Sequence, residues 1–524
     1  MLTAARFVWA NAILLLVTGC LAAPIVTIPK DSAKKDISMD VLRDKIRGGW
    51  AGQMVGVSYG ANTEFRALGT TYSLPFKSEP IENAIMQDDL YVEMTFAKVM
   101  DDEGINAPSS AYGAMFRDAK YNLWHANAGA LRNLNRGIVP PMSGNPKFNA
   151  HSDDIDFQIE ADFIGLMCPG LPQTSNKLCD RVGHVMNYGD GVYGGMFVTG
   201  MYAAAYFESD VEKIVRAGLA CLPEESEYAQ IINDCLEAWK ANPTNWEAAW
   251  ETVNHKWDRM DLCPDGALMP LNIDAKINGA FIALGLLYGQ GDMDKTLEVT
   301  TRCGQDSDCN PSSAAGVVGT IMGYKALPEH MRAAVESIRD KKFSFTVYSF
   351  DDICTSTEKR LMDAVKAAGG QLDETGTTLT VCTQTPKPAR LEQWFPGKPV
   401  KLIPTSNAAW SFKGVWGVDQ ATSCTKSVTA GDEATLKFNG TGIVLCGFQS
   451  VSGGRADVYI DGKKHPLTLD AWIPANCYDV DMWREWNLAP GKHELRLVVR
   501  DDADARATNK EIILVRAVIY DKKH

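Results

Sequence analysis

The chain has 524 residues, 45% of them hydrophobic, and a formal net charge of −13 at pH 7. A chain of this size can bury a large core, so we expect more than one folded domain and exclude a mainly disordered protein. The negative charge argues against nucleic acid and anionic lipid as partners, because both are bound through Lys and Arg that neutralise phosphate. A neutral or cationic substrate fits the charge, as does an anionic one held through a metal ion.

Residues 1–20 resemble a bacterial lipoprotein signal peptide. An apolar run over residues 12–17 is too short to span a bilayer as an ordinary helix. The segment ends in Val17-Thr18-Gly19-Cys20, which resembles a lipobox, so we expect lipidation of Cys20; cleavage near Ala22-Ala23 is the alternative. Residues 21–40 are polar and are expected to form a tether. These features predict an exported protein, either a cell-envelope lipoprotein or a periplasmic or secreted one, that meets the membrane only through a lipid anchor.

From residue 41 to about residue 342 the pattern is helical, and we expect an all-α domain. Gly48, Gly52, Gly56 and Gly60 recur every fourth residue, which leaves a bare stripe on a helix where another backbone can approach closely. Such a helix must be buried. Amphipathic helices are expected after two acidic motifs, residues 87–89 and 306–308, because apolar residues recur after both at helical spacing.

After the helical region the composition changes twice. Residues 343–384 are expected to form a small α/β appendage, with strands at 343–350 and 378–383 and a helix at 351–368. Residues 385–400 are a Pro-rich linker, across which few contacts are expected. Residues 401–524 have the pattern of an all-β sandwich, with short strands predicted at 435–438, 442–448, 456–460, 494–499 and 511–519.

The two acidic motifs each stand at the start of a predicted helix. Asp88 and Asp89 lie where the helix dipole favours negative charge, and Asn310 and Pro311 are expected as N-cap and first helical residue of the second helix. Neighbouring carboxylates repel one another unless a cation lies among them, and hard oxygen ligands favour Mg²⁺, Mn²⁺ or Ca²⁺. Helix capping alone is the alternative explanation for either motif.

Two other patterns point to different chemistry. Residues 306–310 imitate the start of an EF-hand loop, but Pro311 stands where that loop needs glycine. Gly56-Val57-Ser58-Tyr59-Gly60 matches the G-x-S-x-G motif of serine esterases, which needs a strand before the serine, whereas residues 41–46 have a helical pattern. Because the motif matches, an esterase that uses Ser58 stays an alternative to a metal-dependent hydrolase, although the helical pattern argues against it.

Four segments resemble, in order and spacing, the ADP-ribosylglycohydrolase superfamily: Gly52-Gln53-Met54-Val55-Gly56, Glu64, Gln87-Asp88-Asp89 and Gly304-Gln305-Asp306-Ser307-Asp308-Cys309-Asn310. The resemblance covers about residues 41–324. It implies an all-α fold with two Mg²⁺ ions in a central cleft, and hydrolysis of the bond at the anomeric carbon of an ADP-ribosyl group.

The resemblance also implies site residues. Glu64 corresponds to a glutamate near the metals and the scissile bond, and Glu64 or Asp89 is the candidate catalytic acid or base. The metal ligands carried over by position are Gln87, Asp88, Asp89, Asp306, Asp308 and Cys309. Gln87 and Cys309 stand where the family has threonine, and Val57 where it has aspartate. Because a soft thiol suits Mg²⁺ poorly, the resemblance leaves open whether one ion or two are bound.

Two further segments are candidates for binding the sugar. Residues 151–160 carry more acid than a helix start requires, and residues 188–195 are glycine-rich with aromatic side chains. The candidate substrate-binding residues are Asp154, Gln158, Glu160, Tyr188, Gly189, Asp190 and Tyr193. A solvated helix start and a simple turn are the alternatives. His125 and Asn127 are also candidates to face the cleft, although a lone histidine is more often structural.

Together these patterns predict a Mg²⁺-dependent hydrolase of a glycosyl bond. An exported enzyme with a β-sandwich meets glycans or glycosides more readily than ADP-ribosylated protein, so a carbohydrate substrate is expected. Hydrolysis of an ADP-ribosylated acceptor and noncatalytic glycan binding are alternatives. Trp472, Trp483 and Trp486 of the sandwich can stack on sugars, but tryptophans in sandwiches are more often core.

Overall fold

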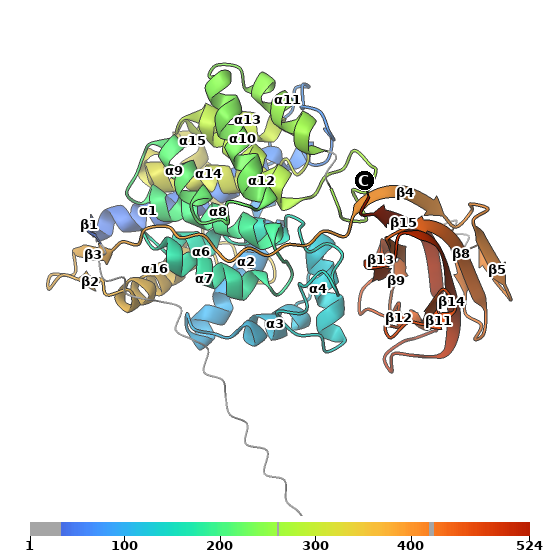
Figure 1. Ribbon diagram of the computed structural model, residues 1–524. Coiled ribbons are helices and arrows are strands. Elements are labelled where there is room, and N and C mark those ends of the chain that lie inside the picture. Colours follow the sequence, from blue (N-terminus) through green and yellow to red (C-terminus); the bar gives the residue numbers. More distant parts are fainter. Residues whose placement is uncertain (1–32, 259–260, 419–423, 524) are drawn as a thin grey trace, which may run out of the picture.

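The computed structural model describes residues 33–258, 261–418 and 424–523. They form a helical domain and, beside it, a β-sandwich (Figure 1). The predicted signal peptide, including Cys20, and most of the predicted tether lie outside the described residues. Among the described helices, none combines the length and the apolar character needed to cross a membrane.

The helical domain is built around one large apolar core. Its helices are α1 (Met39–Gly60), η1 (Ala61–Thr63), η2 (Ile81–Met86), α2 (Asp88–Glu103), α3 (Ser109–Asp118), α4 (His125–Asn135), α5 (Asp156–Ile159), α6 (Asp162–Leu166), α7 (Pro172–Gly183), α8 (Asp190–Ala205), α9 (Val211–Leu219), α10 (Glu227–Ala241), α11 (Trp246–Trp257), α12 (Ala275–Gly289), α13 (Met293–Arg302), α14 (Cys309–Met322), η4 (Tyr324–Ala326), α15 (Glu329–Ile338) and α16 (Phe350–Ala367). The all-α prediction for this part of the chain is confirmed.

The glycine stripe of α1 packs directly on the backbone of α14. A Cβ atom added at Gly52 would lie 2.1 Å from the carbonyl oxygen of Ala315, and one added at Gly56 would lie 2.2 Å from that of Pro311. Gly48 and Gly60 approach α14 and the loop before it as closely. The prediction of a buried helix with one bare face is confirmed. The contact places Gly60, and with it the residues that follow α1, beside the second acidic motif.

We expect Gly52→Ala to destabilise the protein. The added methyl group would overlap backbone atoms of α14, which cannot rotate away as a side chain can, so the two helices would have to separate. Overpacked cores lose about 1–3 kcal/mol, and a loss of this size should appear in urea unfolding curves. Gly417→Ala is the control, because a Cβ atom at Gly417 meets nothing within 4 Å. Equal midpoints for the two variants would contradict the close contact.

A small antiparallel sheet, of order β1-β3-β2, closes the helical domain. Its strands are β1 (Lys34–Ser38), β2 (Gln371–Leu372) and β3 (Thr378–Cys382), with Lys34 paired to Cys382 and Ser38 to Thr378. The predicted tether is therefore wrong over residues 34–38, which form an edge strand. β3 agrees with the predicted strand at 378–383.

Two expectations for the α/β appendage are wrong. Residues 343–349 form turns instead of a strand: the Phe343 amide donates to the Tyr348 carbonyl oxygen at 2.9 Å, and Phe345 has a φ of 60°. The helix that follows, α16, is not separate from the main domain. Its apolar face joins the large core, and the Trp50 indole of α1 donates to Thr357 Oγ1 at 3.1 Å.

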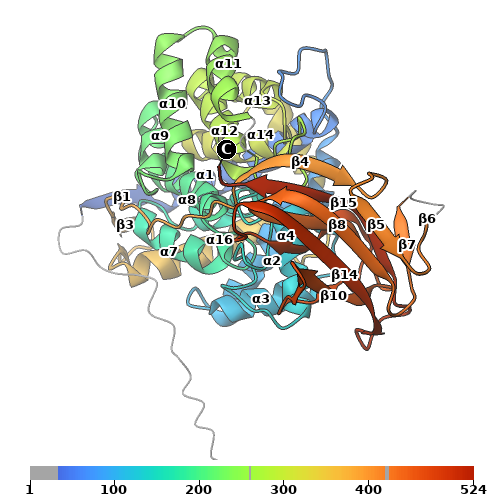
Figure 2. The same ribbon diagram turned by 45° about the vertical axis from the view of Figure 1, so that its right-hand side comes forward.

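The C-terminal part is a sandwich of two antiparallel sheets (Figure 2). One has the order β11-β10-β14-β8-β5 with β12 beside β10, and the other the order β13-β9-β15-β7-β6 with β4 beside β15. The strands are β4 (Lys398–Pro404), β5 (Trp410–Lys413), β6 (Gly417–Val418), β7 (Thr425–Ser427), β8 (Glu433–Gly440), β9 (Gly442–Gln449), β10 (Gly454–Ile460), β11 (Lys463–Lys464), β12 (Leu469–Asp470), β13 (Cys477–Glu485), β14 (Gly491–Ala503) and β15 (Ile512–Asp521). The predicted sandwich is confirmed.

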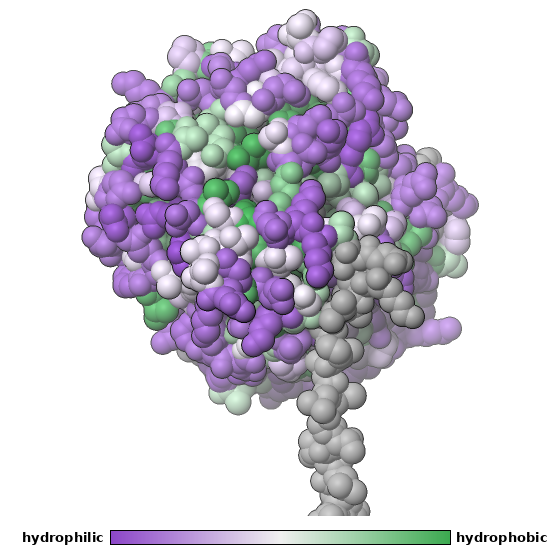
Figure 3. Space-filling model, turned by 90° about the vertical axis from the view of Figure 1, so that its left-hand side faces the viewer, coloured by the Kyte–Doolittle hydropathy of each residue, from purple (hydrophilic) through white to green (hydrophobic). Residues whose placement is uncertain are grey.

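The sheet that contains β9 and β15 is buried on both faces. On β15, Ala517 and Ile519 belong to the sandwich core, whereas Val518 and Tyr520 join Ala150 of the helical domain in a separate apolar cluster. By contrast, the face of the helical domain opposite the sandwich is mostly hydrophilic, with scattered apolar side chains (Figure 3). The sandwich is therefore packed onto the helices.

Polar contacts also cross the boundary. The buried Arg132 guanidinium donates to the buried Asp481 carboxylate, and the Trp486 indole donates to the Pro146 carbonyl oxygen at 3.1 Å. The predicted linker, residues 385–400, is itself held on the helical domain: the Ala389 amide donates to the Cys221 carbonyl oxygen at 3.0 Å. In Figure 1 it crosses the helices as an extended trace between β3 and β4. The expectation of few contacts across the linker is wrong.

Candidate functional site

A cavity of about 270 Å³ opens in the helical domain where the N-terminal ends of α2, α4 and α14 converge. It is lined by Glu64, Phe65, Met86, Gln87, Asp88, Tyr91, Trp124, His125, Asn127, Ile155, Asp156, Ile159, Ile273, Asp306 and Cys309. The fold thus brings the two distant acidic motifs to one place. Helix N-termini carry partial positive charge, which favours carboxylates at this point.

The acidic side chains do not serve as helix caps. Asp308, not Asn310, is the N-cap residue of α14, and neither Asp308 nor Gln87, the N-cap residue of α2, makes a capping hydrogen bond with its side chain. The prediction of Asn310 as N-cap is wrong because the helix already begins at Cys309. The Asn310 side chain instead donates to Asn278 Oδ1 at 2.8 Å. Helix capping alone does not explain why these carboxylates are buried here.

Several buried carboxylate oxygens of the two motifs lack a partner. Within the described residues, both side-chain oxygens of Asp89 and one each of Asp306 and Asp308 accept no hydrogen bond. Burial, together with the neighbouring carboxylates, raises the pKa of Asp89 and Asp308 well above the usual range, and burial and Glu64 raise that of Asp306 to about 8. Such groups are costly unless a cation neutralises them, so these residues fit a metal ion.

The ligand atoms of the second motif lie close together. The Asp306 and Asp308 carboxylates and the Cys309 sulfur have ligand atoms within 4.8 Å of one another. Burial and the adjacent Asp306 raise the pKa of the Cys309 thiol well above its usual value, which favours the protonated form in the absence of metal. Because the unpartnered atoms are all oxygens, the chemistry of the set favours a hard divalent cation.

Glu64 lies at the rim of the cavity, just after η1, and its side chain reaches solvent. The backbone on either side is tied to the second motif: the Phe65 amide donates to the Gln305 carbonyl oxygen at 3.1 Å, and the Gln305 amide to the Ala67 carbonyl oxygen at 2.9 Å. Partial burial and the charges of Asp308 and Asp88 raise the pKa of Glu64 to about 8. Glu64 is thus placed to hold or release a proton near neutral pH.

We expect the metal-free protein to lose stability as pH rises. Glu64 and Asp306, with pKa values of about 8 in the folded protein and ordinary values when unfolded, bind more protons folded than unfolded between about pH 4 and pH 8. The protons on these two groups therefore stabilise the folded protein fully below the pKa values of the unfolded chain. This stabilisation is lost as the pH rises to about 8. Thermal unfolding at pH 5 and pH 8 in a chelator should show this fall, and saturating Mg²⁺ should reduce it. A chelated protein equally stable at both pH values would contradict the arrangement.

The predicted substrate-binding segment at 151–160 reaches the cavity through other residues than expected. Ile155, Asp156 and Ile159 line it, whereas the structure does not place Asp154, Gln158 or Glu160 in the cavity wall. Gln158 Oε1 accepts from the Tyr228 hydroxyl at 2.7 Å, Glu160 accepts from Asn127, and Asp154 accepts from His151 at 2.8 Å. These three side chains are buried and hold the wall from behind.

The second predicted segment is not at the cavity. Tyr188, Gly189, Asp190 and Tyr193 lie at the start of α8, under the segment 385–400. The Tyr193 hydroxyl donates to the Arg390 carbonyl oxygen at 2.8 Å, and the Gly189 amide donates to Glu392 at 3.3 Å. The sequence carries no signal that residues 188–193 are covered, because the covering segment lies some 200 residues further along the chain.

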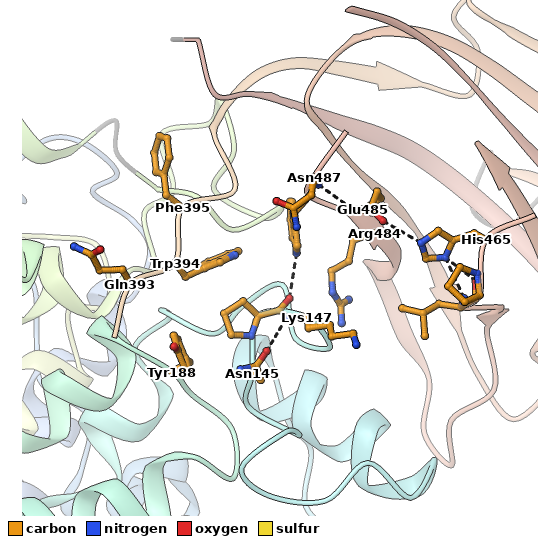
Figure 4. A pocket seen from close by; sticks show the side chains of 14 residues that line it. Asn145, Lys147, Tyr188, Gln393, Trp394, Phe395, His465, Arg484, Glu485 and Asn487 are labelled. Carbon is orange, nitrogen blue, oxygen red and sulfur yellow. Dashed lines mark hydrogen bonds and ion pairs between the residues drawn. The ribbon is translucent and has the colours of Figure 1, made fainter. Parts of the chain in front are cut away.

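Tyr188 instead lines a groove of about 570 Å³ at the domain boundary. Figure 4 shows its walls: Trp394 and Phe395 from the connecting segment, Asn145 and Tyr188 from the helical domain, and residues such as Arg484 from the sandwich. Trp394 packs edge-on against Trp486 with ring centroids 5.6 Å apart. The groove thus combines aromatic rings with amide and charged side chains.

The remaining sequence candidates have structural positions. Ser58 lies inside helix α1 and is buried, so the strand-to-helix turn that a G-x-S-x-G nucleophile requires is absent from this described segment. Trp483 belongs to the sandwich core. Trp472 is buried with the Arg506 guanidinium 3.8 Å from its ring centroid. His125 and Asn127, which the sequence offers as candidates to face the cleft, do line the cavity.

Comparison with known structures gives partial likenesses. A chain of an ADP-ribosylglycohydrolase-related protein complex is 13% identical and aligns over 62% of this chain and 99% of its own, with a TM-score of 0.40. A family two carbohydrate esterase from Clostridium thermocellum in complex with cellohexaose is 20% identical over 21% of this chain and 30% of its own, with a TM-score of 0.16. A two-domain esterase active on acetylated mannans is 16% identical over 33% of this chain and 47% of its own, with a TM-score of 0.21. TM-scores this low carry no functional argument.

No curated protein matches the chain. The family model for ADP-ribosylglycohydrolase, however, matches residues 38–367, which run from the residue before α1 to the end of α16 and include both acidic motifs and Glu64. A match over this much of the chain, with the cavity geometry described above, shows that the protein belongs to the ADP-ribosylglycohydrolase family of hydrolases.

Proposed function

We propose that this protein hydrolyses a glycosyl bond at the anomeric carbon of a glycan or glycoside, with Mg²⁺ as its metal. The observation that carries the proposal is the set of unpartnered, buried carboxylate oxygens of Asp89, Asp306 and Asp308 behind one cavity, with Glu64 at its rim. Asp88, Gln87 and Cys309 complete the candidate ligand set. Bound there, Mg²⁺ would neutralise the carboxylates and favour the binding of sugar hydroxyls or water oxygen.

Glu64 is proposed as the catalytic acid or base. Hydrolysis breaks the bond between the anomeric carbon and the leaving oxygen and forms one between that carbon and water oxygen. The attacking water must lose a proton and the leaving oxygen must gain one. Glu64 is solvent-accessible and carries a raised pKa, so its carboxyl group can exchange a proton in this way. Asp89, which is buried, is the second candidate base.

A carbohydrate substrate is supported by the aromatic groove at the domain boundary and by the export signal predicted from residues 1–20. An ADP-ribosylated acceptor is the second candidate, because the family takes its name from that reaction. The helical setting of Ser58 removes the support for a serine esterase.

A panel of aryl glycosides and ADP-ribosyl conjugates, assayed with Mg²⁺ and with a chelator, tests the proposal. We expect chelator-sensitive release of the aglycone from at least one glycoside. Turnover of ADP-ribosyl conjugates alone would replace the glycoside proposal by the second candidate. Hydrolysis that survives chelation would contradict the metal-dependent mechanism, and binding without turnover would favour a noncatalytic glycan-binding role.

We expect Glu64→Gln to lower kcat by about 10²–10⁴-fold while leaving most of the Mg²⁺-dependent stabilisation intact. The amide has the size of the carboxylate but cannot exchange a proton in this range, and the buried aspartates that would hold the ion are unchanged. Glu329→Gln is the matched control, because the Glu329 side chain is 80% exposed and lies outside the cavity. If Glu64→Gln keeps wild-type kcat, Glu64 is not the acid or base and Asp89 takes its place as candidate.

A further inference from the structure

His125 lies between the cavity and two chains of contacts that lead to the sandwich. It is the first residue of α4 and lines the cavity together with Glu64 and Asp306. Its φ is 41°, in the left-handed region that a residue other than glycine rarely adopts. Such a conformation persists only where the surroundings fix it. Asp156 accepts hydrogen bonds from the next two backbone amides, which anchors the helix start but leaves the imidazole to be held by other groups.

Among the described residues His125 Nδ1 has no hydrogen-bond partner, and its neighbours are carboxylates at ion-pair distance. The first of these carboxylates leads to β15. His125 Nδ1 lies 3.4 Å from Asp265 Oδ2, and Asp265 Oδ1 lies 3.8 Å from Arg516 Nη2 on that strand. Arg516 is itself fixed: it donates to the Pro264 carbonyl oxygen at 3.0 Å and to both oxygens of Asp479 at 3.1 Å. The guanidinium thus holds the loop that carries Asp265 against the sandwich.

The second group leads to β13. His125 Nδ1 lies 3.8 Å from Asp154 Oδ2, which His151 contacts through Nδ1 at 2.8 Å. The other ring nitrogen of His151 lies 3.5 Å from Asp481 Oδ1 of the sandwich. The side chains of Asp154, His151 and Asp481 are at most 3% exposed. Water therefore does not screen this chain of contacts. Burial lowers the pKa of His151 to about 4, and burial with the neighbouring carboxylates raises that of Asp154 well above its usual range, so both groups are neutral near pH 7 and the chain acts through close contact.

The groups of the first chain carry opposite charges in alternation. Burial alone would favour a neutral Asp265, but His151, His125 and Arg516 outweigh it and lower its pKa below the usual range. Burial likewise disfavours the charged form of His125, but Asp265, Asp156 and Asp261 outweigh it and raise its pKa. An anionic Asp265 therefore lies between the His125 ring and the Arg516 guanidinium, so the three groups attract one another.

We propose that Arg516 and Asp481 are positioning residues for His125, so that the β-sandwich supports the wall of the hydrolytic site in the helical domain from behind. The effect of this positioning on catalysis rests on the proposed function. If the cavity binds the sugar, His125 is placed to contact it beside Glu64. A sandwich that served only to bind a distant part of the substrate would need neither chain of contacts.

Arg516→Met tests the proposal in the full-length protein, with Arg516→Lys as the charge-conserving variant. We expect Arg516→Met to lower kcat at least tenfold with little change in KM, and to shift the His125 ring signals in NMR spectra, assigned through His125→Gln. Arg516→Lys should restore most of both. Arg500→Met is the control: Arg500 lies on β14 and pairs with Asp457 and Asp502 within the sandwich.

Wild-type His125 signals in Arg516→Met would overturn the proposal, whatever the activity. Should that variant fail to fold, Asp265→Asn breaks the same chain while leaving β15 unchanged, and the same shift of the His125 signals is expected. If the wild-type protein hydrolyses no member of the substrate panel, the proposed function fails, but the NMR comparison still decides whether the sandwich positions His125.

Discussion

Asp306→Ala and Asp88→Ala should each abolish stabilisation of the protein by Mg²⁺. Removing one ligand leaves the remaining carboxylates of the two motifs facing one another with a weaker hold on any cation. An ion present at about 100 times its dissociation constant adds about 2.7 kcal/mol to the free energy of unfolding, so its loss is readily measured. The measurement is the difference between unfolding curves in Mg²⁺ and in chelator, for each variant and for the wild type.

Asp340→Ala provides the control for this experiment, because the Asp340 side chain is 92% exposed and is not part of the cavity. It should keep the full Mg²⁺ response. The variants themselves are expected to fold without metal, since each removes one of several mutually repelling charges. If both Asp306→Ala and Asp88→Ala respond to Mg²⁺ like the wild type, the two motifs do not share an ion and the metal-dependent mechanism loses its basis.

Removing the sandwich should impair the helical domain. A fragment that ends near residue 400 would expose the apolar cluster around Ala150 and leave the buried Arg132 without the Asp481 carboxylate. We therefore expect the fragment to be poorly soluble, or to bind a hydrophobic dye and have low activity even on small substrates.

A single substitution in the full chain tests the same boundary. Val518→Asp places a charge on the face of β15 that contacts the helical domain and should separate the two parts, which limited proteolysis would detect. Val415→Asp is the control, because Val415 is 71% exposed on the sandwich surface. A soluble, fully active fragment would show that the helical domain does not need the sandwich. A Val518→Asp protein that is cleaved no faster than Val415→Asp would show that this face of β15 does not hold the two domains together.

Much of the fold was predictable because it depends on local patterns. The glycine spacing on α1 specified a helix that another backbone approaches, and the acidic motifs identified the helix starts that meet at the cavity. The unbroken apolar run of residues 442–448 is a further local pattern with a structural meaning. A strand with one solvated face alternates, whereas all but one of these residues are buried, so the run indicated a second covered face.

Other features could not be predicted because their causes lie far along the chain. Lys34–Ser38 is polar, and it forms a strand only because β3, more than 300 residues later, offers an open edge. Residues 343–350 alternate like a strand, but the left-handed Phe345 turns the chain. The part played by His125 depends on Asp265 and Arg516, and no spacing in the sequence links the three residues.

The pairing of β1 with β3 determines how the helical domain would respond to mechanical force. Lys34 begins the first strand of the described chain and Cys382 ends β3, and these two residues are paired with each other in the antiparallel ladder. The Thr383 amide extends the ladder outward by donating to the Ala33 carbonyl oxygen at 2.8 Å. Tension between the two ends would therefore open the strands one pair at a time, beginning at Ala33 and Thr383. This unzipping needs far less force than shearing all the pairs at once, so under load β1 should peel away first while the cavity stays assembled.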